Sequence, residues 1–283
     1  MSLRSPNRIL ALMLLLTVTA TTVAQMPGFP GGRGGGRRRA RPVETAGERN
    51  GVPEWSVDDR FKSDVFTFVR VKYSSYGGGW GGGKWATDYP DSDLNFSFRL
   101  HQLTALEVDP HGKILELTDE AIFDYPFLYL IEPGMMVLDE AEVLGLRKYL
   151  QNGGFLMVDD FWGEDEWHNF YREIKRVFPD REPVELPLEH EIFHCVYELK
   201  EKPLIPSIHS WWNGQRTERW DATEAHYRGI FDDKGRLMAI ICHNTDLGDG
   251  WEREGLDQGY FKEYSEKFAY PLGINIVTYA MTH

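Results

Sequence analysis

The sequence predicts an α/β fold, with a mainly parallel sheet sandwiched by helices and an added β-hairpin region. Short apolar runs typical of buried strands alternate with amphipathic helical segments between residues 65 and 178. Such alternation is the pattern of βαβ units. Two apolar runs around an Asp-Lys-Gly turn, within residues 226–244, predict the hairpin. The chain has 283 residues, 42% of them hydrophobic, which is enough to bury one sizeable core.

The first strand is expected at residues 65–73, because β-branched and aromatic residues fill this run. Residues 93–106 place apolar side chains near helical spacing, with Asp91 or Ser92 available as the N-cap. Two short apolar runs then follow with the length and composition of strands, at 113–117 and 127–131.

The segment 138–154 is expected to be a helix, with carboxylates in its first turn and Gly153 as its C-cap. Residues 155–161 form an apolar run consistent with a strand buried on both faces. Further elements are expected along the rest of the chain: a helix at 164–178, a strand at 190–199, and a helix at 259–283 that Pro271 kinks.

The N-terminus has the order of a secretory signal peptide, which we assign to residues 1–24. Arg4 and Arg8 precede an apolar run at 9–18, and Ala24 ends a small-residue cleavage site. An uncleaved N-terminal anchor is the alternative. The sequence therefore predicts an exported bacterial protein, periplasmic or extracellular, with no transmembrane segment after cleavage.

Residues 25–60 are rich in Gly, Arg and Pro and are expected to form a disordered tether before a single α/β domain at 64–283. Eight of the basic residues lie within residues 1–50, so the rest of a chain with a net charge of −13 is strongly acidic. An acidic surface repels nucleic acid and anionic membranes. The expected partner is an envelope protein or a small polar ligand, and no nucleic acid.

The glycine-rich stretch YGGGWGGGKWA (76–86) follows the first strand, where many α/β proteins bind a phosphate group. A P-loop requires Ser or Thr after its lysine, because that hydroxyl binds Mg²⁺, whereas Trp85 follows Lys84 here. The helix would also have to begin at the lysine, and Pro90 and Asp91 place its start later. We therefore predict no nucleotide site in this loop.

In an open α/β sheet, ligands bind beyond the carboxyl ends of the strands, so polar and aromatic residues at those positions are the candidate site. His190, His194 and the loop at residues 245–252 could complete it from the second half of the chain. The candidate ligand-binding residues are Trp85, Asp88, Glu132, Asp159, Asp160, Trp162, His190, Asp246 and Asp249.

Several chemistries fit this set. Asp88, Asp159 and Asp160 have the oxygen ligands that a hard divalent cation prefers, and carboxylates beside tryptophans also suit glycoside chemistry. Helix capping and turn formation are the structural alternatives. His190 and His194 have the spacing of a helical zinc pair, but their surroundings favour a strand, where such residues lie far apart. We assign no metal ligand, no cofactor and no catalytic residue from the sequence.

Four separated motifs resemble the bacterial family called domain of unknown function 4159: WATDYP (85–90), FDYPFLYLIEPG (123–134), LRKYLQNGGFLMVDDFWG (146–163) and GINIVTYAMTH (273–283). The resemblance implies a fold like the class I glutamine amidotransferases, a flavodoxin-like α/β sandwich. It implies no activity. The amidotransferase motif has a Cys in a tight elbow, with His and Glu later in the chain, and this sequence lacks that elbow.

Two functions remain open. One is a non-catalytic module of the cell envelope that binds a ligand or a partner at this edge. The alternative is a carboxylate-dependent hydrolase acting on envelope glycans or amides, with Asp160 or Asp159 as the base and with or without a metal ion.

Overall fold

The computed structural model of the chain describes residues 49–61, 64–76 and 83–283. The predicted signal peptide and most of the predicted tether lie outside these residues. The last tether residues contact the α/β body: the Arg49 guanidinium donates to the Pro110 carbonyl, and the Trp55 indole donates to the Val108 carbonyl over 2.8 Å.

A seven-stranded sheet forms the centre of the described body, and five of its strands run parallel. In spatial order the parallel strands are β3 (Lys113–Glu116), β1 (Val69–Lys72), β4 (Phe127–Ile131), β6 (Phe155–Asp159) and β9 (Leu237–His243). At one edge β8 (His226–Phe231) and β7 (Val184–Glu185) pair antiparallel. A separate ribbon pairs β2 (Ser74–Ser75) with β5 (Met136–Val137). The structure confirms the predicted mainly parallel α/β fold with its β8–β9 hairpin; the finer likeness to amidotransferases stays a prediction.

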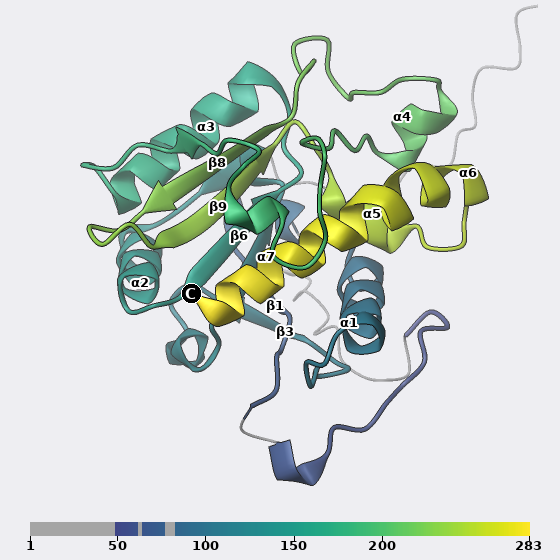
Figure 1. Cartoon of the computed structure of the whole chain (residues 1–283). Coiled ribbons are helices and arrows are strands. Elements are labelled where there is room, and N and C mark those ends of the chain that lie inside the picture. The colour runs from purple at the N-terminus through teal and green to yellow at the C-terminus, as the bar shows by residue number, and fades with distance from the viewer. Residues whose placement is uncertain (1–48, 62–63, 77–82) are drawn as a thin grey trace, which may run out of the picture. The chain divides into compact units, whose positions relative to one another are not determined.

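Helices cover both faces of the sheet (Figure 1). One face packs against α1 (Asp91–Leu103), α5 (Leu247–Glu252) and α7 (Tyr270–Thr282), and the other against α2 (Glu140–Gln151) and α3 (Gly163–Val177). Two short helices, α4 (Ile208–Trp212) and α6 (Gln258–Tyr260), precede a π-helical segment at Phe261–Ala269. Pro271 stands in the first turn of α7, directly after that segment. None of the helices in the described part of the chain is both long and apolar enough to span a bilayer.

Alternation of side chains along β4 and β6 divides the core into two layers. Phe127, Tyr129 and Ile131 lie in the cluster with α1 and α7, whereas Leu128 and Leu130 lie in the cluster with α2 and α3. Neighbouring residues of a strand point to opposite faces, so a strand buried on both faces is apolar throughout. This explains why FLYLI and FLMV read as continuous apolar runs.

The strand predicted at 190–199 is wrong. Glu191–Phe193 form a 3₁₀ turn, and residues 194–199 belong to no strand. The Asn275 side chain takes the place of a strand partner: its Oδ1 accepts from the backbone amides of Val196 and Tyr197, and its Nδ2 donates to the Tyr197 carbonyl. Because α7 already satisfies this backbone, the apolar residues here are buried without joining the sheet.

Candidate functional site

A pocket of about 300 Å³ opens at the carboxyl ends of the parallel strands. Its wall contains residues that follow β1, β4, β6 and β9. Since β3 and β4 lie on opposite sides of β1, the strand order reverses at β1. A crevice beyond the carboxyl ends at such a reversal is where open α/β sheets bind ligands.

Carboxylates dominate the pocket wall. Lys84 and Arg253 are its basic side chains, and Thr87, Trp162, Ser207 and His209 also contribute. Seven acidic residues line it: Asp88, Glu132, Asp160, Glu166, Glu218, Asp246 and Asp249. This excess of negative charge favours a positively charged or neutral ligand over an anion.

The backbone is strained where the strands end at this edge. Glu132, Asp160 and Asn244 directly follow β4, β6 and β9, and their φ angles are 47°, 54° and 62°. Asp88, in the loop after β1, has a φ of 60°. Each such residue costs about 1–3 kcal/mol, and such strain concentrates at functional sites. The concentration of these strained residues at the carboxyl ends of the strands therefore supports the pocket as the functional site.

Asp160 follows β6 and is buried, with 7% of its surface exposed. Its Oδ1 accepts a hydrogen bond of 2.9 Å from the indole Nε1 of Trp162. Burial, together with the nearby Glu132 and Asp88, raises the pKa of Asp160 well above its usual range. The ionised form of Asp160 is therefore costly unless a cation offsets it.

Asp246 and Asp249 lie at the start of α5. Asp246 is the N-cap, because its Oδ1 accepts from the Asp249 amide over 2.6 Å. Burial and the neighbouring carboxylates of Asp160 and Asp249 raise the pKa of Asp246. The Asp249 carboxylate accepts from the Ile208 amide and pairs with Arg253 Nε at 3.1 Å.

A buried arginine fixes the loop that carries Asp88. Arg70 of β1 is fully buried and pairs with Asp93 of α1. Its Nη1 donates to the carbonyls of Trp85 and Thr87 over 3.0 and 2.9 Å. Because these carbonyls belong to the turn that leads into Asp88, Arg70 sets the path of the backbone into the pocket.

Glycine at position 248 leaves room for the Asp88 carboxylate. A Cβ at this position would lie 2.8 Å from Asp88 Oδ2 and 2.9 Å from the Tyr129 hydroxyl. Asp88 Oδ2 is enclosed and has no hydrogen-bond partner within the described structure. Burial raises the pKa of Asp88 well above its usual range, an effect that Arg70 and Arg253 partly offset.

Lys84 and Glu132 form an ion pair on the pocket wall. The Thr87 hydroxyl donates to Glu132 Oε1 over 2.9 Å. Lys84–Ala86 form a short 3₁₀ turn, and α1 begins at Asp91 with Pro90 at its N-cap. The helix thus begins beyond Lys84, as the reasoning against a phosphate-binding loop required; residues 77–82 lie outside the described residues.

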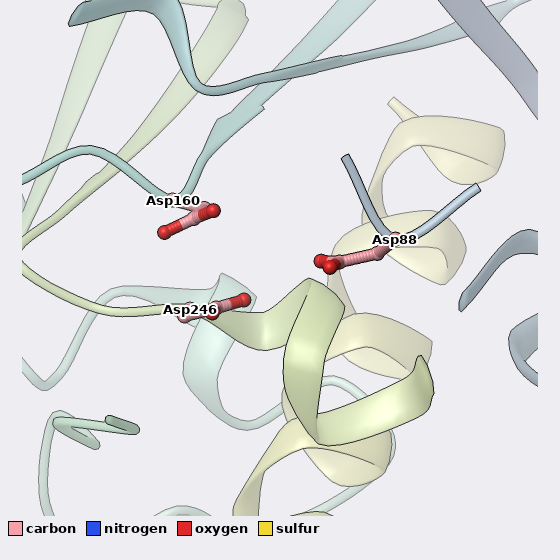
Figure 2. Close-up of side chains that lie close together, drawn as sticks. All are labelled: Asp88, Asp160 and Asp246. Atoms are coloured by element: carbon pink, nitrogen blue, oxygen red, sulfur yellow. The ribbon is translucent and has the colours of Figure 1, made fainter. Parts of the chain in front are cut away.

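The structure brings six of the nine candidate residues together on the pocket wall: Asp88, Glu132, Asp160, Trp162, Asp246 and Asp249. Figure 2 shows Asp88, Asp160 and Asp246 pointing toward one another from separate segments. Neither Asp88 nor Asp160 accepts from a helix-terminal amide through its side chain, whereas Asp246 is the N-cap of α5.

The other three candidates lie outside the pocket wall. Trp85 is buried in the core with 6% of its surface exposed. Asp159 is wholly buried, and its Oδ2 accepts from the Tyr129 hydroxyl and the amides of Leu247 and Gly248, each over 3.0 Å. Burial raises the pKa of Asp159 to about 7.

His190 lies near the amino end of β9, away from the carboxyl ends of the parallel strands where the pocket opens. Its ring centroid is 6.3 Å from that of Phe231, which pairs with Leu237 at the start of β9. It is also 5.7 Å from Tyr279 of α7. Since the pocket lies beyond the end of β9, His190 does not contribute to it.

Sequence reasoning missed several residues of the wall. Ser207, His209 and Glu218 come from the segment around α4, which has no periodic pattern. Glu166 and Arg253 also line the pocket. Glu166 had one signal, since it lies in the acidic first turn of α3, directly after β6.

Two curated proteins are similar to part of the chain. Both are subunits of the enzyme "ATP-dependent helicase/nuclease", from two strains of Desulfitobacterium hafniense, and each is 26% identical over 146 residues. The match covers 47% of this chain and 10% of each relative. The chain therefore spans about a tenth of the length of these relatives.

A family match covers most of the chain. Residues 67–281 match the family described as "Domain of unknown function (DUF4159)". The match includes the described strands, the α-helices except for the last residue of α7, and every described residue of the pocket wall. It confirms the resemblance drawn from the four sequence motifs. The chain thus belongs to the DUF4159 family.

Proposed function

We propose that this protein is an exported ligand-binding module of the bacterial cell envelope, and that its carboxylate pocket binds a small polar ligand that is positively charged or neutral. One observation carries the proposal: among the described residues, seven carboxylates but only two Lys or Arg side chains line a pocket of about 300 Å³ at the strand-order reversal. A cleft lined by one sign of charge concentrates the opposite charge and repels its own. Phosphorylated ligands and nucleic acid are therefore unfavourable ligands.

Thermal-shift measurements on the folded chain test this proposal. The panel contains divalent cations, polyamines, neutral oligosaccharides and inorganic phosphate. We expect stabilisation by at least one cationic or neutral compound and none by phosphate. Asp246→Asn is the test variant, because Asn retains the N-cap of α5 while removing the charge. Asp124→Asn changes an exposed carboxylate outside the pocket and is the matched control. Equal shifts in wild type and both variants would contradict the proposal.

A hydrolase acting on envelope glycans or amides is the second candidate, and the spacing of the carboxylates favours it. Oxygen atoms of Asp88, Asp160 and Asp246 lie within 4.8 Å of one another. This is nearer to the separation of about 5–5.5 Å in retaining glycosidases than to the wider one of inverting enzymes. Asp160 would then be the nucleophile or the base.

Turnover distinguishes the two candidates. Purified cell-wall glycans are incubated with the wild type and with Asp160→Asn, and released reducing ends are counted. Turnover by the wild type that the variant loses would establish the hydrolase. Binding without turnover, at protein concentrations that saturate the glycan, would leave the binding module as the function.

A further inference from the structure

Three carboxylates from separate segments meet in the pocket. Asp88 lies in the loop after β1, Asp160 directly follows β6, and Asp246 follows β9. One oxygen from each lies within 4.8 Å of the others, and Figure 2 shows the three side chains directed at a common space. An ion at the centre of three oxygens that are 4.8 Å apart would lie about 2.8 Å from each, so Ca²⁺, which binds oxygen at about 2.3–2.6 Å, can contact all three after shifts of a few tenths of an ångström.

Asp160 and Asp246 are buried and Asp88 is partly buried, and one oxygen of each lacks a hydrogen-bond donor. Asp160 and Asp246 are 7% and 4% exposed and line the pocket. Their Oδ1 atoms accept from Trp162 Nε1 and the Asp249 amide. Within the described part of the chain, no donor reaches the Oδ2 atom of either residue, and Asp88 Oδ2 is enclosed without a partner. Asp88 Oδ2 is thus a buried acceptor without a donor, which is costly, and a bound cation removes that cost.

No basic side chain of the described residues forms an ion pair with these three carboxylates. Lys84 pairs with Glu132. Arg253 pairs with Asp249 and Glu252, at 3.1 and 2.5 Å.

A second group of carboxylates lies beside the first and differs from it in its positive partners. Asp88, Asp249 and Glu252 also bring oxygens within 4.8 Å of one another. There, the Arg253 guanidinium already supplies the positive charge, and Asp249 also accepts from the Ile208 amide. In the first group, Arg70 and Arg253 act on Asp88 without forming an ion pair with any of the three carboxylates, so the two groups are predicted to differ in their need for an external cation.

We propose that Asp88, Asp160 and Asp246 bind one hard divalent cation, with Ca²⁺ the best fit. This rests on the proposed function, because the cation is either the ligand of the pocket or the centre on which a polar ligand's hydroxyl or carbonyl oxygens bind. Three protein carboxylates suit Ca²⁺, which accepts an irregular cage of six to eight oxygens, better than Mg²⁺, which keeps most of its waters. The rest of the pocket volume leaves space for water and a ligand beside the ion.

Isothermal titration of chelator-treated full chain with Ca²⁺, Mn²⁺ and Mg²⁺ tests the proposal. We expect one site with Ca²⁺ bound at least as tightly as Mg²⁺. Asp160→Asn and Asp246→Asn retain the hydrogen bonds at Oδ1 and should weaken Ca²⁺ binding by about tenfold or more. Glu252→Gln removes a carboxylate of the neighbouring group and should change the affinity by less than about threefold. Circular dichroism confirms that each variant is folded.

Terbium luminescence reports the location. Tb³⁺ replaces Ca²⁺ and emits when a nearby indole is excited, and the Trp162 indole lies against Asp160. The emission should fall strongly in Trp162→Phe and persist in Trp220→Phe, which changes an indole that is 90% exposed.

The outcomes separate the two proposals. The cation site would be overturned if none of the divalent cations bound the wild type. It would also be overturned if Asp160→Asn and Asp246→Asn left the binding affinity unchanged. If a polyamine or saccharide still bound in chelator and was lost in Asp246→Asn, the pocket would stand without the ion. If neither ions nor organic compounds bound, both proposals would fail.

Discussion

Asp160→Asn should stabilise the protein when no cation is present, which is the opposite of the usual effect of changing a buried residue. At a separation of 4.8 Å, two ionised carboxylates repel by about 3 kcal/mol if the effective dielectric constant is about 20. Asp160 has two such neighbours, Asp88 and Asp246. Its pKa is raised, so part of this repulsion is already relieved by protonation. We therefore expect a net gain of about 1–3 kcal/mol in the free energy of unfolding.

The assay compares melting temperatures of wild type and Asp160→Asn in chelator at about pH 8, where carboxyl groups are most ionised. A gain of that size raises Tm by several degrees, at about 2–4 °C per kcal/mol for a domain of this length. Saturating Ca²⁺ should reverse the order, because the ion stabilises the wild type through mass action. Asp124→Asn, which changes an exposed carboxylate, should melt with the wild type in both conditions.

If Asp160→Asn were less stable than the wild type in chelator, repulsion among these carboxylates would not be what limits the stability of the cation-free protein. That result would mean that Asp160 contributes a favourable internal contact that outweighs its repulsion from Asp88 and Asp246.

Three further predictions follow from individual contacts. Replacing Arg70 by Met leaves Asp93 buried without its partner and should cost about 3–5 kcal/mol in urea unfolding; a loss below about 1 kcal/mol would contradict this role. Adding a Cβ by Gly248→Ala displaces Asp88 Oδ2, so Tb³⁺ affinity should fall by about tenfold, and unchanged affinity would exclude the contact. His243 is buried, and burial lowers its pKa to about 3. Below about pH 6.5 the unfolded chain binds a proton at His243 that the native state does not bind, so the free energy of unfolding falls as the pH drops. His243→Gln should reduce that loss by about 2 kcal/mol between pH 6.5 and pH 5, measured by urea unfolding at both pH values, and identical pH dependence of both proteins would argue against it.

The site carboxylates after strands were predictable because parallel strands end at a common edge. Glu132 and Asp160 directly follow apolar runs that are recognisable as strands, so the sheet itself brings them together, whereas Asp88 lies in the loop after β1 that Arg70 holds. Asp246 follows the second strand of a hairpin whose turn is explicit in the sequence. The convergence of Glu132, Asp160 and Asp246 follows from the fold class, which the sequence indicates well, whereas the position of Asp88 also depends on Arg70 and Gly248.

The remaining wall residues depend on contacts that no local pattern records. The segment carrying Ser207 and His209 is irregular, and it is fixed by the bond from the Ile208 amide to Asp249 and by the Tyr260 hydroxyl donating to the Pro206 carbonyl. Those partners lie 41 and 54 residues away in the chain. Spacing and composition cannot predict such pairs, because tertiary packing selects them.

His190 illustrates a different limit. Its neighbourhood has the composition of a strand, and a strand there would have allowed its side chain to approach the pocket edge. The backbone is instead held by Asn275 of α7, and the His190 ring packs near Phe231 and Tyr279. Apolar residues can be buried beneath a loop as well as in a sheet, and composition does not separate the two cases.

Anomalous diffraction from a crystal of the chelator-treated chain soaked in Mn²⁺ or Tb³⁺ would show whether the three carboxylates bind a metal ion. If these residues bind a cation as proposed, an anomalous peak should lie at coordination distance from the carboxylate oxygens of Asp88, Asp160 and Asp246. A pocket without a peak, or a peak only at the carboxylates that already pair with Arg253, would contradict it.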